Sequence, residues 1–133
     1  MVKHALLAAM AFLAATTSAL AQAAVAPELR QRAWYEETLH DLARTLGGAH
    51  AIRLNCAAGD YTLFRFMERL IAEESVTLRP TLENAWNEGF RRERAMHPRC
   101  TSASQAAEQT LRDEGARLAD GLAAANGAVP PTP

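Results

Sequence analysis

The sequence predicts an all-α protein, a four-helix up-down-up-down bundle with one disulfide. Apolar residues recur at intervals of three and four positions in four successive segments, which is the period of an α-helix. No stretch alternates apolar and polar residues, so we expect no β-strand. The connections between the segments are short, and short connections make consecutive helices antiparallel neighbours.

The N-terminal segment has the composition of a cleavable secretory signal. A basic start at Met1–His4 precedes an uncharged run at Ala5–Ala15, which has the length of a signal h-region and is too short to span a bilayer. Small residues in 19–21 and 21–23 form two overlapping sites for signal peptidase. We therefore expect a signal peptide at 1–21, cleaved after residue 21 or 23, and a periplasmic protein with no transmembrane segment after cleavage.

The composition indicates one small, nearly neutral domain. The chain of 133 residues has a formal net charge of −1, and loss of the only lysine, Lys3, makes the mature protein slightly more acidic. No basic stripe is present, so a surface for nucleic acid is not indicated. We expect a helical domain at 28–125 with a marginal core and a disordered, proline-rich tail at 126–133.

The first predicted helix runs from Pro27 or Glu28 to Ala58. Gly47 and Gly48 interrupt it, and each glycine costs about 1 kcal/mol relative to alanine in a helix interior. The pair marks either a kink or the close approach of another backbone, and we favour close approach. The apolar stripe of this helix is Tyr35, Leu39, Leu42, Ala43, Leu46, Ala49 and Ala57.

Three further helices follow, and residues with known capping preferences mark their ends. Gly59 is expected to end the first helix and Asp60 to cap the second. Thr77 is expected to cap the third helix, and Thr101 or Ser102 the fourth. Ser102 is also placed to form a capping box with Gln105. The predicted bounds are Tyr61–Glu74, Leu78–Met96 and a fourth helix that ends at 126–127. The inward residues are Leu63, Phe66, Met67, Leu70 and Ile71, then Leu78, Leu82, Ala85, Trp86, Gly89 and Met96, then Ala107, Leu111, Gly115, Leu118 and Leu122.

The two cysteines are expected to form a disulfide. In an up-down-up-down bundle, the end of the first helix and the turn before the fourth lie at the same pole, which brings Cys56 to Cys100. Export to an oxidising compartment favours the bond. The alternative is a copper site formed by both thiolates with Met96 and His97. No C-x-x-C motif for redox chemistry or haem attachment is present, and we expect no cofactor.

Several short motifs lie along the predicted bundle: Leu42-Ala43, Leu46-Gly47, His50, Arg53 and Cys56, then Trp86-Asn87-x-Gly89-Phe90, Cys100-Thr101 and Glu114-Gly115-Ala116-x-Leu118-Ala119. They resemble a family of uncharacterised small exported proteins of alphaproteobacteria. The likeness covers about Leu39 to Ala124, and the spacing of histidine, arginine and cysteine is its most specific part. The family is a domain of unknown function, so the resemblance implies export, helices and paired cysteines, and no activity.

Four polar residues fall on or beside inward faces of the predicted helices. At about 100° per residue, His50 and Arg53 lie within the apolar stripe of the first helix, Glu93 on the inward side of the third, and Asn87 at its edge. Arg53 and Glu93 could form a buried ion pair, because burying either charge alone would be costly. The group is either a network that specifies the fold or a polar pocket for an anionic ligand or proton transfer.

The sequence does not indicate a particular reaction. It has no serine or thiol nucleophile with a matching base, and no metal site is indicated. The leading hypothesis is a non-catalytic periplasmic accessory or binding module with an envelope protein as its partner. The alternative is a small enzyme or anionic-ligand-binding protein that uses His50, Arg53 and Glu93.

Overall fold

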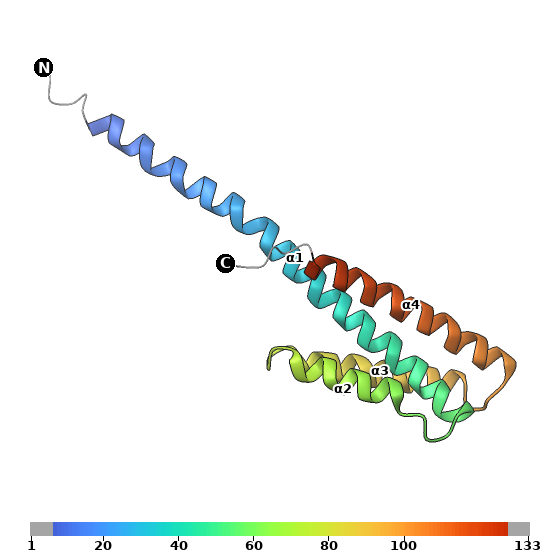
Figure 1. Cartoon of the computed structure of the whole chain (residues 1–133). Helices are drawn as coiled ribbons and strands as arrows, with labels where there is room; N and C mark the ends of the chain where they lie inside the picture. The colour runs from blue at the N-terminus through green and yellow to red at the C-terminus, as the bar shows by residue number, and fades with distance from the viewer. Residues whose placement is uncertain (1–6, 128–133) are drawn as a thin grey trace, which may run out of the picture. The chain divides into compact units, whose positions relative to one another are not determined.

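A computed structural model describes residues 7–127 of the chain, and the side chains of 27–126 (Figure 1). These residues form helices and, within the described range, no strand, so the all-α prediction is confirmed. The helices are α1 (Leu7–Cys56), α2 (Thr62–Glu73), α3 (Arg79–Met96) and α4 (Ser102–Gly127). The observed bounds lie within two residues of the predicted ones, except at the start of α1.

The start of α1 differs from the prediction. The helix begins at Leu7 and continues through Pro27, where we expected it to begin. Proline removes one backbone donor, but the preceding residues are rich in alanine, which has the highest helix propensity. Leu7 to Trp34 belong to one compact unit, and a second unit begins at Tyr35. No described helix is long and apolar enough to cross a membrane.

Two predictions for the chain ends fall partly outside the described residues. Residues 1–6 of the predicted signal peptide and residues 128–133 of the predicted tail are outside that range. Asn126 and Gly127, where the fourth helix is predicted to end and the tail to begin, are the last residues of α4. The signal peptide and its cleavage stay predictions.

The second unit holds the helical bundle. Within it, the C-terminal part of α1 contacts both α3 and α4, and α2 packs against α3 (Figure 1). The buried cluster consists of Leu39, Leu42, Ala43, Leu46, Met67, Leu82, Ala85, Trp86 and Leu122, all from the predicted apolar faces. Three predicted inward residues are wrong: Ala57 and Phe66 are exposed, and Met96 is 64% exposed. Each lies at the end or the edge of its stripe, where a small helix rotation changes burial.

The two glycines of α1 mark close approach, as predicted. A Cβ atom on Gly47 would lie 2.2 Å from the carbonyl oxygen of Trp86 in α3. The reciprocal contact is as tight, because a Cβ atom on Gly89 would lie 1.9 Å from the carbonyl oxygen of Arg44. The backbones of α1 and α3 therefore touch at a point where neither helix can carry a side chain.

The turn between α1 and α2 contains the predicted glycine and aspartate, but Tyr61, not Asp60, is the N-cap of α2. Gly59 has a φ of 85°, a left-handed conformation that favours glycine. The carboxylate of Asp60 accepts a hydrogen bond from the amide of Thr62 at 3.0 Å, and so satisfies one free donor at the start of α2.

The predicted caps of α3 and α4 need correction. Leu78, not Thr77, is the N-cap of α3, and the Thr77 hydroxyl lies 3.2 Å from that of Ser75. Thr101 caps α4 as one of the two expected residues. Its hydroxyl accepts from the amide of Ser104, and its own amide donates to the Ser104 hydroxyl. This reciprocal pair is the capping box that we had assigned to Ser102 and Gln105.

Candidate functional site

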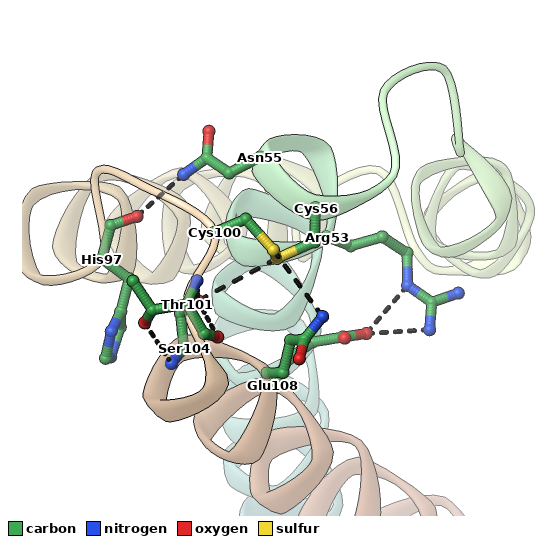
Figure 2. Close-up of a disulfide and its surroundings, with 9 residues drawn as sticks. Arg53, Asn55, Cys56, His97, Cys100, Thr101, Ser104 and Glu108 are labelled. Carbon is green, nitrogen blue, oxygen red and sulfur yellow. Dashed lines mark hydrogen bonds and ion pairs between the residues drawn. A yellow bond between two sulfur atoms is a disulfide. The ribbon is translucent and has the colours of Figure 1, made fainter.

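The disulfide joins the end of α1 to the turn before α4, as predicted. Cys56 and Cys100 are bonded, with their Cα atoms 4.9 Å apart (Figure 2). At the same pole, the side-chain amide of Asn55 donates to the carbonyl oxygen of His97 at 2.8 Å, which ties α1 to the end of α3. The copper alternative required two thiolates, and both sulfurs are committed to the disulfide.

Arg53 forms an ion-pair network beside the disulfide. Its Nε donates to Glu108 at 2.8 Å, and its Nη1 donates to Asp60 at 2.9 Å. Figure 2 shows the first pair bridging α1 and α4. Burial opposes the charge of Arg53, but the hydrogen bonds and charges of Glu108 and Asp60 outweigh it and raise the Arg53 pKa. Hydrogen bonds from Thr62, together with Arg53, lower the pKa of Asp60.

The expected pair of Arg53 with Glu93 is not formed. Glu93 is buried, as predicted, but its carboxylate accepts from Nε of Arg92 at 2.9 Å and lies 3.6 Å from Nε2 of His97. Its Cγ packs over Gly48, where a Cβ atom would approach to 2.7 Å. The partners of the Glu93 carboxylate therefore come from α3 itself and from the residue that follows it, and not from α1.

His50 lies in an aromatic cluster. The side chain is buried, with 3% of the residue exposed. Its ring centroid lies 5.9 Å from that of Tyr61, 6.1 Å from Phe64, 5.4 Å from Trp86 and 6.0 Å from Phe90. These rings come from α2, α3 and the residue before α2, so three segments converge on one imidazole.

The imidazole of His50 is neutral near pH 7. Burial lowers its pKa below the ordinary 6.5; the charge of Asp60 acts in the opposite direction, and that of Arg53 lowers the pKa further. Among the described residues, nothing hydrogen-bonds to Nδ1 of His50, although this atom is buried. A buried polar atom without a partner is uncommon in proteins and costs about 1–3 kcal/mol.

Two adjoining cavities lie beside this cluster. The smaller, of about 240 Å³, is lined by His50, Leu54, Tyr61, Phe64, Trp86, Asn87 and Phe90. The larger, of about 470 Å³, lies between α2 and α3 and is lined by Phe64, Met67, Glu68, Ile71, Ala72, Arg79, Glu83, Trp86 and Asn87. The cavities share Phe64, Trp86 and Asn87. We call them together the α2–α3 groove.

The structure brings together two of the four residues of the predicted polar pocket. His50 and Asn87 line the smaller cavity, whereas Arg53 and Glu93 are not among its lining residues. The sequence prediction missed Tyr61, Phe64 and Phe90. Phe64 is not part of the predicted apolar stripe of α2. An aromatic residue outside the stripe was the one signal in the sequence that a second apolar surface lies on this helix.

The comparisons with known proteins give a family and no activity. No curated protein and no solved structure matches the chain at a significant level. Residues 34–125, more than half of the chain, match the family described as Protein of unknown function (DUF2385). This range contains the disulfide, the ion pairs of Arg53 and the whole α2–α3 groove. The chain therefore belongs to the DUF2385 family.

Proposed function

We propose that this protein is a non-catalytic binding module of the periplasm that holds a small apolar molecule in the α2–α3 groove. The observation that carries the proposal is the pair of adjoining cavities with shared aromatic lining. Ligand pockets in proteins typically have volumes of about 300–1,000 Å³ and mostly apolar walls with a few polar groups. The groove has this size, and its walls combine the shared rings of Phe64 and Trp86 with charged side chains at the larger cavity, among them Arg79 and Glu83.

The exposed rings of the groove support binding rather than a purely structural role. Tyr61 is 48% exposed and Phe64 39% exposed, although each could gain free energy by leaving water, at about 25 cal/mol per Å² of apolar area. A ligand in the groove would cover both. The concave shape and small volumes favour a small molecule over a flat protein surface.

The location rests on the sequence and the disulfide. The predicted signal peptide directs export, and an oxidising compartment maintains a disulfide between Cys56 and Cys100. The predicted envelope partner fits this location as a protein that delivers or receives the ligand. The enzyme alternative needs His50, Arg53 and Glu93 at one cavity, and the last two are engaged in ion pairs elsewhere.

Native mass spectrometry tests the proposal. Protein isolated gently from the envelope fraction of producing cells should carry an adduct of discrete mass that denaturation releases. Phe64→Glu should abolish the adduct. Phe66→Glu is the matched control, because both residues lie in α2 and are 39% exposed, but only Phe64 lines the groove.

Three outcomes would overturn the proposal. Protein that is free of ligand in every preparation would contradict the proposed binding function. An equal loss of adduct in the Phe66→Glu variant would remove the groove as the site. A stoichiometric protein partner that is lost in Phe64→Glu alone would replace the small molecule with a protein-binding surface.

A further inference from the structure

We infer that the smaller cavity of the groove is a subsite for one neutral aromatic ring whose hydroxyl group hydrogen-bonds to the imidazole of His50. The ligand class is therefore a phenol. This inference rests on the proposed function and specifies which part of an apolar molecule enters the groove at its His50 end. Three properties of the cavity carry it: its rings, its volume and its unused hydrogen-bonding group.

The rings of the cavity are arranged to contact another ring. Aromatic pairs in proteins prefer centroid separations of 4.5–7 Å in tilted, stacked or edge-on geometry. His50 has four such neighbours between 5.4 and 6.1 Å, and Phe64 and Trp86 meet edge to face at 6.2 Å. A ring in the cavity beside them would contact the parts of these side chains that line it, in the same kinds of geometry.

The volume fits a single substituted ring. An apolar cavity of about 150 Å³ already accommodates benzene. The cavity beside His50 has about 240 Å³, which leaves room for one or two small substituents. A larger ligand would extend past Phe64, Trp86 and Asn87 into the adjoining cavity, because these residues line both.

The imidazole supplies a hydrogen-bonding group that the protein itself does not use. Neutral imidazole has one nitrogen that donates and one that accepts. Nδ1 of His50 has no partner among the described residues but is closed off by its neighbours. The hydrogen bond to a ligand is therefore assigned to Nε2, for which the described residues provide no partner either, and the side chain lines the cavity. A hydroxyl group both donates and accepts, so it suits either tautomer of His50.

The lining disfavours anionic rings. None of its residues carries a charge near pH 7, since burial keeps the pKa of His50 low. The guanidinium of Arg53 is held by Glu108 and Asp60, and that of Arg94 lies over the ring of Phe90, 5.8 Å from its centroid. Moving an ionised group from water into such a cavity without a countercharge is strongly unfavourable. A benzoate ion should therefore bind more weakly than a neutral phenol.

Calorimetric titration of the mature protein, the full chain after removal of any signal peptide, with three probes of similar size tests the inference. Para-cresol should bind about three- to tenfold more tightly than toluene, which corresponds to one net hydrogen bond. Benzoate should show no binding at the same concentrations. Phe64→Glu should abolish binding of para-cresol, and Phe66→Glu should leave it unchanged.

A spectroscopic measurement on the unmodified protein covers the case in which a His50 variant fails to fold. The imidazole ¹⁵N resonances of His50 should shift much more at saturation with para-cresol than at saturation with toluene, because only the phenol forms a hydrogen bond to the imidazole. In a folded His50→Phe variant, the preference of para-cresol over toluene should disappear.

The outcomes separate this inference from the proposed function. Equal affinities for para-cresol and toluene would overturn the role of His50 and leave an apolar site intact. No binding of either ring would overturn the subsite, while the adduct in native mass spectrometry decides the proposed function independently. Tighter binding of N-acetyltyrosinamide than of para-cresol would overturn the assignment to a small molecule and assign the cavity to a tyrosine of a protein.

Discussion

Replacement of Gly89 by alanine should destabilise the bundle more than the addition of one methyl group usually does. Gly89 lies where α3 crosses α1, and its new Cβ atom would lie 1.9 Å from the carbonyl oxygen of Arg44. Ordinary contacts begin at 3.4 Å, so the two backbones must separate by more than an ångström. The obstacle is helix backbone, which cannot rotate away as a flexible side chain can.

The magnitude follows from two opposing effects. Overpacking of a well-packed interior costs about 1–3 kcal/mol, and sometimes more. Alanine is favoured over glycine in a helix by about 1 kcal/mol, which offsets part of that cost. Because the clash is backbone against backbone, we expect the upper end of the range and a net loss of about 2 kcal/mol. For a domain of this size, that lowers Tm by roughly 10 °C.

Denaturant unfolding followed by far-ultraviolet circular dichroism measures the change. Gly121→Ala is the matched control, because Gly121 is also helical and a Cβ atom there would meet nothing within 4 Å. The same chemical change should stabilise by about 0.5–1 kcal/mol at that position. Equal effects at the two sites, or a Gly89→Ala variant as stable as the parent, would refute the contact between α1 and α3.

Three other predictions concern the disulfide, His50 and export. Reduction of the Cys56–Cys100 bond, which spans a sequence separation of 44, should cost about 4 kcal/mol in the chain-entropy model; a melt with reductant measures it, and an unchanged Tm would contradict it. Because burial lowers the pKa of His50 below 6.5, the unfolded chain binds that proton more tightly, so stability is lost as pH falls through and below 6.5. His50→Gln should flatten this dependence in melts at pH 7 and 5, and a parallel dependence in both proteins would refute the assignment. The intact mass of periplasmic protein should correspond to cleavage after residue 21 or 23. The mass of the uncleaved chain would contradict the prediction of a signal peptide.

The helices and the disulfide could be predicted because each depends on local pattern and chain order. The positions of Leu39, Leu42 and Leu46 specify one face of α1 whatever the rest of the chain does. The meeting of Cys56 with Cys100 needed only the direction of consecutive helices. Neither inference required the rotation or the axial shift of one helix against another.

The partner of Arg53 could not be predicted, because it depends on that axial shift. Helical periodicity predicts that Arg53 and Glu93 lie on inward faces near one pole of the bundle. Glu93 is indeed buried. The choice among Glu93, Glu108 and Asp60 depends on how far α3 and α4 extend past the end of α1, and on the turn at Gly59. Helical periodicity contains no information on either.

The aromatic cluster was missed for a related reason. Trp86 was assigned to the core from its stripe, but Tyr61 precedes α2 and Phe64 lies off the stripe of that helix. Each ring taken alone resembles an ordinary surface residue, and single exposed apolar residues need no explanation. The cluster exists only because three segments converge on His50, which is a property of the assembled bundle.

The three sides of the smaller cavity differ in how firmly the rest of the fold holds them in place. This difference determines which substitutions can test binding without destabilising the bundle. His50 lies one turn beyond Gly47, and Phe90 follows Gly89, so the contact between α1 and α3 holds two sides in place. The disulfide fixes the same end of α1. The third side is α2, which has a single fully buried residue, Met67. Substitutions on the exposed face of α2 therefore alter the groove without disturbing the crossing of α1 and α3. A loss of ligand in Phe64→Glu, with stability unchanged, would thus report on the site itself.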